Sequence, residues 1–134
     1  MTTRIAFLLV GALAAASCET ATSPTPTADT ELLLREFSSL VVPRGAASRE
    51  FTLTAQGAIS VTLKSTTPAD VVVGIGVGIP RSNGSCALST AIEAVAGAAA
   101  QVTINAEAGT YCAKVYDPGT LTSPVPFTIS ISRP

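Results

Sequence analysis

Residues 125–132 read VPFTISIS, and apolar and polar side chains alternate along the whole stretch. Successive side chains of a β-strand point to opposite faces, so this alternation predicts a strand with one face in a core and the other toward water. Residues 50–55 and 59–64 alternate in the same way. Because proline cannot donate a ladder hydrogen bond, Pro126 predicts an edge strand or a bulge within the first run.

A run over residues 71–79 (VVVGIGVGI) has the same period of two, but glycines stand where the other runs have polar residues. The apolar face that we expect to be buried consists of Val71, Val73, Ile75, Val77 and Ile79. Val72 and three glycines fall on the other face, where the backbone is left bare, so we expect neighbouring side chains to lie close against it. The glycines are not a phosphate-binding loop, because no Lys-Ser/Thr pair and no helical pattern follow them.

Turn-forming sequences divide the rest of the chain at intervals of about 8–12 residues, a spacing typical of β-sandwiches. They lie at residues 43–45, 56–57, 68–70, 80–84, 108–109 and 117–119. The alanine-rich residues 91–100 contain Gly97 and lie among strands, which favours a loop or an irregular strand over a helical turn. The sequence therefore predicts an all-β protein with one antiparallel β-sandwich domain over residues 31–134.

The N-terminus carries Arg4, an uncharged apolar run over residues 5–16, and Cys18 directly after small residues. The run is too short to span a bilayer, which takes about 20 apolar residues, and suits the core of a signal peptide. The pattern resembles the lipobox of bacterial lipoproteins, which implies removal of residues 1–17 and attachment of lipid to Cys18. The alternative is an ordinary signal peptide cut after an Ala-x-Ala site, which leaves that cysteine as a free thiol.

Residues 18–30 join this signal to the predicted domain and are rich in Thr, Ser, Pro and Ala, with no apolar period. We expect them to form an extended tether between the lipid on Cys18 and the sandwich. The expected location is the bacterial cell envelope, with the protein anchored by lipid at the outer membrane and periplasm or at the cell surface.

The chain contains three cysteines, and assigning Cys18 to lipid leaves Cys86 and Cys112 as a pair. Disulfides persist in the oxidising environment of exported proteins, so we expect these two cysteines to be bonded. The alternative is a pair of buried thiols.

Composition limits the chemistry of this chain. Histidine is absent, which excludes Ser-His-Asp triads, Cys-His dyads and histidine-bearing metal sites. Without the signal peptide, nine acidic residues stand against seven basic ones with no long charged run, so nucleic-acid binding is not expected. The acidic residues are scattered, and we expect no catalytic residue, cofactor or metal. Asp70 and Asp117, both in turns, are alternative calcium ligands.

Two small groups of residues are candidates for a binding surface. Arg81 and Asn83 lie in a polar loop, and loops on a rigid scaffold commonly carry recognition residues, although this one is equally a plain hairpin connection. Lys114 and Tyr116 form a second candidate patch, with cross-strand packing as the alternative role of the tyrosine. Phe37 is a further aromatic that such a surface could use.

The motif at residues 108–119, AGTYCAKVYDPG, followed by residues 125–131, is similar to the closing strands of bacterial pre-peptidase C-terminal domains. Residues 51–54 and 59–63 resemble the early strands of that family, and the resemblance covers roughly residues 35–134. It implies a jelly-roll-like β-sandwich that is generally non-catalytic. The family is found beside secreted peptidases and in cell-surface proteins, and some members bind calcium.

Tyr111 of this motif shares a face with Ala113 and Val115, so we expect its ring to enter the core and its hydroxyl to bond to nearby backbone. The functional prediction is a monomeric, lipid-anchored, exported sandwich with a non-catalytic structural or binding role toward a protein or a glycan. The alternative is an accessory or inhibitory subunit of a secreted hydrolase, because domains of the resembled family are found beside secreted peptidases.

Overall fold

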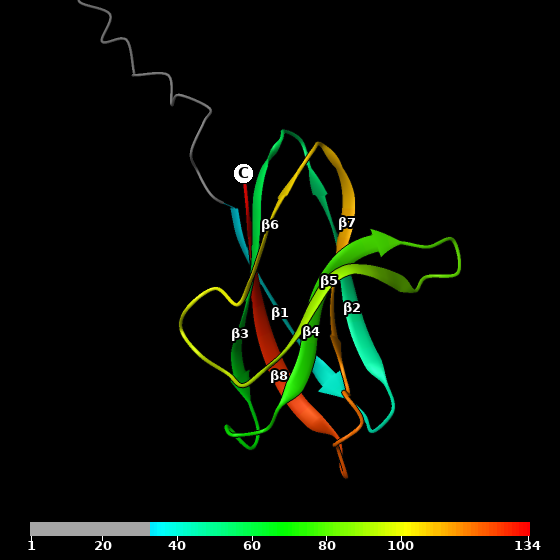
Figure 1. The fold of residues 1–134 in the computed structure, drawn as a ribbon, viewed down its shortest axis with the longest axis vertical. Coiled ribbons are helices and arrows are strands. Elements are labelled where there is room, and N and C mark those ends of the chain that lie inside the picture. Colours follow the sequence, from blue (N-terminus) through cyan, green and yellow to red (C-terminus); the bar gives the residue numbers. More distant parts are fainter. Residues whose placement is uncertain (1–32) are drawn as a thin grey trace, which may run out of the picture.

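The computed structural model describes residues 33–134, and this part of the chain forms eight β-strands with no helix among them (Figure 1). The strands are β1 (Leu33–Val41), β2 (Ala46–Leu53), β3 (Gly57–Thr66), β4 (Val73–Pro80), β5 (Cys86–Ala94), β6 (Val102–Ala106), β7 (Gly109–Tyr116) and β8 (Val125–Arg133). They form two four-stranded sheets around one core. The predicted all-β fold with a single sandwich domain is confirmed.

The two sheets have the strand orders β1-β8-β3-β6 and β2-β7-β4-β5, and every pairing is antiparallel. The pairs β1–β8, β2–β7, β3–β6 and β4–β5 make the chain one long two-stranded ribbon, and the loop between β4 and β5 is its turn (Figure 1). All the remaining connections between consecutive strands pass from one sheet to the other, so the ribbon is rolled up on itself. This is the strand order of a jelly roll.

The core between the sheets is built from the apolar positions of the alternating runs. Its members include Phe51, Leu53, Ile59, Val61, Leu63, Val125, Phe127, Ile129 and Ile131, all of them buried as the alternation predicts. Burying each such side chain contributes about 1.5–3 kcal/mol, so these runs supply much of the free energy that holds the sheets together.

Tyr111 lies as the sequence predicts. Its half-buried ring packs against the core and stacks on Phe51, with 6.3 Å between the ring centroids. Its hydroxyl donates a hydrogen bond to the backbone carbonyl of Glu107 at 2.9 Å. The tyrosine therefore fastens the turn between β6 and β7 to the strand that follows it.

The glycine row of β4 brings other parts of the chain against its bare backbone, as expected. Val73, Ile75 and Val77 are fully buried on the core side. On the outer face the Tyr116 ring lies over Gly74, and a Cβ atom added there would overlap it. At Gly78 it is the backbone of β5 that lies against the glycine, because an added Cβ would overlap the carbonyl group of Ala87.

Two expectations for the strands are wrong. Ile79 is 56% exposed rather than buried, because β4 leaves β7 after Gly78 and carries the isoleucine beyond the core. β8 is a central strand, between β1 and β3, so the edge that Pro126 allowed is wrong. The other alternative, a bulge, has a counterpart close to the proline, because the β3–β8 register shifts between Leu63 and Ser65. The proline is tolerated because β3 ends beside it, and its carbonyl accepts the last hydrogen bond there, from the Thr67 N–H at 3.1 Å.

The predictions for residues 1–17 and for the tether at residues 18–30, including lipid on Cys18, lie outside the described residues. Among the residues that the structure does describe, no helix has the length and apolar character needed to cross a membrane.

Candidate functional site

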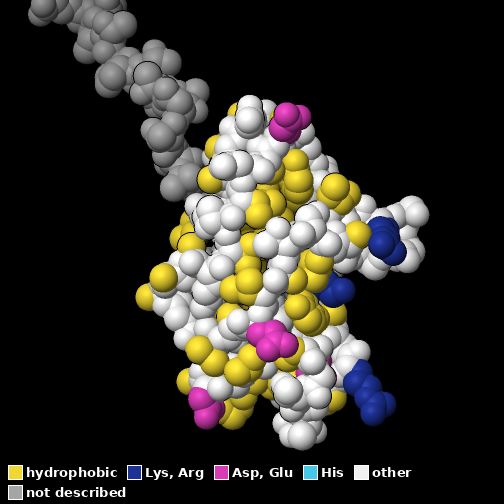
Figure 2. All heavy atoms as spheres, viewed as in Figure 1, with side chains coloured by type: hydrophobic (Ala, Val, Ile, Leu, Met, Phe, Trp, Pro, Cys, Tyr) yellow, Lys and Arg dark blue, Asp and Glu magenta, His cyan; other side chains and the backbone are white. Residues whose placement is uncertain are grey.

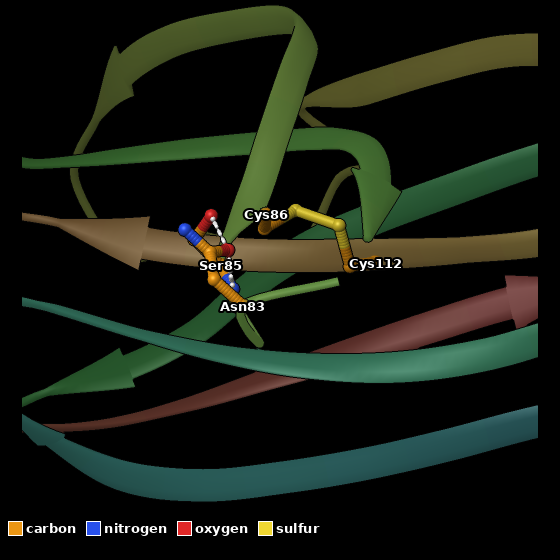
Figure 3. Close-up of a disulfide and its surroundings, with 4 residues drawn as sticks. All are labelled: Asn83, Ser85, Cys86 and Cys112. Carbon is orange, nitrogen blue, oxygen red and sulfur yellow. Dashed lines mark hydrogen bonds between the residues drawn. A yellow bond between two sulfur atoms is a disulfide. The ribbon is translucent and has the colours of Figure 1, made fainter. Parts of the chain in front are cut away.

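The predicted disulfide is present: Cys86 and Cys112 are bonded, with 5.9 Å between their Cα atoms (Figure 3). Cys86 begins β5, whereas Cys112 lies in β7 and pairs with Gly78 of β4. The two cysteines meet because the start of β5 folds over the outer face of β4 at Gly78. A crosslink that closes a loop of this size contributes about 3 kcal/mol on the chain-entropy model.

The loop held by this disulfide projects from the body of the molecule as the end of the β4–β5 hairpin (Figure 1). The Arg81 N–H bonds to the Ser85 carbonyl at 2.8 Å, and the Gly84 N–H bonds to the Arg81 carbonyl at 3.0 Å. Gly84 has a φ of 83°, in the left-handed region that favours glycine. The loop is therefore an ordered projection, and its side chains at residues 81–85 are exposed.

The structure gives Arg81 and Asn83 different roles. The side-chain oxygen of Asn83 accepts hydrogen bonds from the backbone N–H of Ser85 at 3.0 Å and from its hydroxyl at 2.6 Å, next to the disulfide (Figure 3). This oxygen shapes the loop, which is the work of a turn residue. Arg81 is exposed, and its guanidinium is the charged group of this loop.

Lys114 and Tyr116 lie on the outer face of the same sheet and also differ in role. The tyrosine ring is half-buried over Gly74, so cross-strand packing, the alternative raised by the sequence, describes it. Lys114 is paired with Gly76 of β4 and lies two residues after Cys112 on the same face of β7. The structure thus places Lys114 and the braced hairpin on one sheet, β2-β7-β4-β5.

The face that carries β5 in Figure 1 includes a group of apolar side chains. Figure 2 shows hydrophobic side chains gathered along its middle, with only a few charged side chains among them. Exposed members from the strands and loops of this region are Val72, Ile79, Ile92 and Val95. These exposed apolar residues lie on the strands and loops next to the hairpin that carries Arg81.

Asp117 organises the loops at the end of the sandwich where β1 meets β2. Its carboxylate accepts a hydrogen bond from the Arg44 N–H at 2.7 Å, and others from the N–H groups of Gly119, Thr120 and Leu121. The bond from Arg44 is the largest of the influences that hold the pKa of Asp117 at about 2. Both carboxylate oxygens therefore accept hydrogen bonds from backbone N–H groups. Residues 33–134 hold no cluster of three or more acidic or cysteine side chains that could bind a metal.

A groove of about 470 Å³ lies beside this Asp117-capped loop. It is lined by Pro68, Val71, Val72, Leu121 and Val125, together with Glu93 and three hydroxyl side chains. Its size and apolar walls suit a small ligand or one side chain of a partner.

The structure also brings together three arginines that the sequence analysis did not connect. Arg35, Arg49 and Arg133 line a cleft of about 460 Å³ between β1 and β2. They are far apart in the sequence, but each occupies the apolar phase of its strand, in step with Phe37, Phe51 and Ile131 respectively. A charged side chain at a position where the alternation predicts an apolar one is the sequence signal that could have identified these three arginines.

No protein-family model matches the chain, and a search of the curated proteins finds no similar sequence. The resemblance to pre-peptidase C-terminal domains therefore stays a prediction from the motifs quoted above.

Proposed function

We propose that this protein is a non-catalytic binding module of the bacterial cell envelope, held at a membrane by lipid on Cys18. In this proposal it binds a protein or a glycan through the disulfide-braced β4–β5 hairpin and the exposed apolar residues beside it, Val72, Ile79, Ile92 and Val95. The tether at residues 18–30 gives the domain reach above the membrane surface.

The observation that carries the proposal is the crosslinked hairpin. Its loop is held by the Cys86–Cys112 disulfide and by its own hydrogen bonds, and it carries the exposed Arg81. A loop that is ordered before binding loses little conformational entropy when it meets a partner. The bonded pair also supports export, because such crosslinks persist outside the reducing cytosol.

The test is a crosslinking pull-down of the tagged full-length chain from intact bacterial cells, read by mass spectrometry. The variants are Cys18→Ala, which removes the anchor, and Arg81→Ala, which removes the projecting charge. Lys64→Ala, an exposed lysine on the other sheet, is the matched control. We expect partner recovery to fall with the first two variants and to be unchanged with the control.

The same experiment separates the alternatives. A secreted hydrolase as the one dominant partner would make the protein an accessory subunit. Recovery of the same partners in all three variants would contradict the role of the hairpin. Labelling of the chain with an alkyne fatty acid, lost in Cys18→Ala, is the expected sign of lipidation, and equal labelling of that variant would contradict the anchor.

A further inference from the structure

We propose that the cleft between β1 and β2 binds an extended acidic peptide segment, which pairs with the free edge of β1 and places carboxylates beside Arg35, Arg49 and Arg133. The site lies at the opposite edge of the sandwich from β5, and the inference does not depend on the proposed role of the hairpin.

The first observation is the pair of edge strands. β1 is the outer strand of one sheet and β2 the outer strand of the other, and within residues 33–134 no strand pairs with the free side of either. Four consecutive residues of β1, Leu34 to Phe37, line the cleft. An edge strand presents a row of unpaired N–H and C=O groups, and another peptide backbone is the ligand that can pair with them along their length.

The second observation is the direction of the charges. Arg35 and Arg49 share their strand faces with the buried Val41 and Phe51, so both arginines are on the faces of β1 and β2 that are directed toward the other sheet. Glu36 and Glu50 also line the cleft but belong to the outward faces, so they form its rims. This pattern favours a ligand with acidic side chains at every second position, pointing inward, and neutral ones between them.

The third observation is that two of the arginines are held in place before any ligand binds. The Arg49 guanidinium lies over the Phe37 ring, 5.5 Å from its centroid. Arg133 donates a hydrogen bond from Nη1 to the carbonyl of Thr52, and its buried Nε has no hydrogen-bond partner in this part of the chain. Arginine stays charged at every physiological pH, and its planar group matches a carboxylate.

Inward-pointing charges on edge strands also have a simpler role, because they discourage edge-to-edge association. If the arginines had that role alone, removing them would cause self-association. The native chain would then bind neither acidic nor basic peptides. Peptide binding that depends on charge and on backbone pairing is specific to the proposal.

The experiment measures fluorescence anisotropy of a labelled peptide of Glu-Thr repeats with the full-length chain in detergent. The variants are Arg35→Gln and Arg49→Gln. Lys64→Gln, at an exposed lysine that does not line the cleft, loses the same charge elsewhere, and Arg49→Lys keeps the charge. We expect each glutamine variant at the cleft to weaken binding by about tenfold or more, with Lys64→Gln unchanged, Arg49→Lys intermediate, and weaker binding in high salt.

Two further probes test the chemistry of the ligand. A Lys-Thr peptide should not bind, and a Glu-Thr peptide with a methylated backbone should lose binding because it cannot pair with β1. Circular dichroism checks the fold, and the exposed Arg35 carries the test alone if Arg49→Gln is unfolded. Loss of binding with Lys64→Gln, unaltered binding of the methylated peptide, or binding of an oligo-uronate in place of the peptide would overturn the proposal.

Discussion

Asp117 does more for the backbone around it than its place in a surface loop indicates. One carboxylate oxygen bonds the N–H of Arg44, in the β1–β2 turn, and the other bonds three N–H groups of its own loop. The Asp117 N–H in turn donates to the Gly45 carbonyl at 3.0 Å. Two connections that are far apart in the sequence are thus tied through one residue.

The first prediction concerns the pH dependence of stability. Hydrogen bonds, led by that from the Arg44 N–H, lower the pKa of Asp117 from 3.8 to about 2, so in that range the unfolded chain binds more protons than the folded chain. The stabilising contribution is complete above about pH 4 and is lost as pH falls through about 2. Thermal melting should show Asp117→Asn less stable than the native chain at pH 7, with the two curves converging near pH 2. An equal gap at both pH values would contradict this account.

At the scale of a strand, β4 shows how small residues allow a sheet to fold over itself. β5 crosses the outer face of Gly78 so closely that backbone atoms of Ala87 occupy the place of a side chain. The pairing register between β4 and β5 shifts at the same point. The crossing brings Cys86 to Cys112, so the glycine and the disulfide are parts of one arrangement.

We therefore predict that Gly78→Ala costs more than about 2 kcal/mol, because rigid backbone rather than a flexible side chain must move. Gly97→Ala is the matched control. Its nearest neighbour would be Gln101 Nε2 at 3.5 Å, an ordinary contact, and we expect a change within about 0.5 kcal/mol. Urea unfolding measures both values, and an effect of Gly78→Ala no larger than that of the control would show that β5 does not need the bare backbone.

The burial of strand residues was predictable where apolar and polar side chains alternate. It was less predictable where contacts with distant parts of the chain determine which residues are buried. The run that contains Phe127 and Ile129 is buried as its alternation predicts. Ile79 belongs to an equally regular run but is exposed, because nothing in the local pattern shows that β4 parts from β7. The edge position that Pro126 allowed for β8 is wrong, because the point at which the neighbouring strand ends is not encoded near the proline.

At the scale of the whole molecule, the fold is a ribbon whose partners grow more distant in sequence from the hairpin outward. Val77 pairs with Thr90, whereas Val41 pairs with Val125. Closing a long loop costs more entropy than closing a short one, so pairing should begin at the β4–β5 hairpin and end with β1 and β8.

This order of events is testable with two fully buried valines. Val77→Ala, near the hairpin, should slow refolding, and Val41→Ala, in β1, should mainly speed unfolding. Stopped-flow chevron plots, with the disulfide intact, measure both rates. A refolding rate lowered equally by the two substitutions would argue for a nucleus spread over the whole sandwich.

One candidate site could be predicted from residues close together in the sequence, and the other could not. The hairpin around Arg81 was predictable because its turn residues are visible along the chain. The Cys86–Cys112 bond was predictable because these two cysteines remain once Cys18 is assigned to lipid. The cleft was not, since Arg35, Arg49 and Arg133 meet only when the ribbon is rolled up. A charge in the apolar phase of a strand marks such residues in the sequence but does not say what they face.

The pairing of β1 with β8 also decides how the domain bears mechanical force. A pull on the chain ahead of Leu33, resisted at the far end of the sandwich, is directed along β1 and opposed by all of its partners, from Arg133 to Val125. The strand would have to slide past β8 as a unit, so its hydrogen bonds share the load instead of breaking one at a time. The disulfide lies between β5 and β7 and is spared that load.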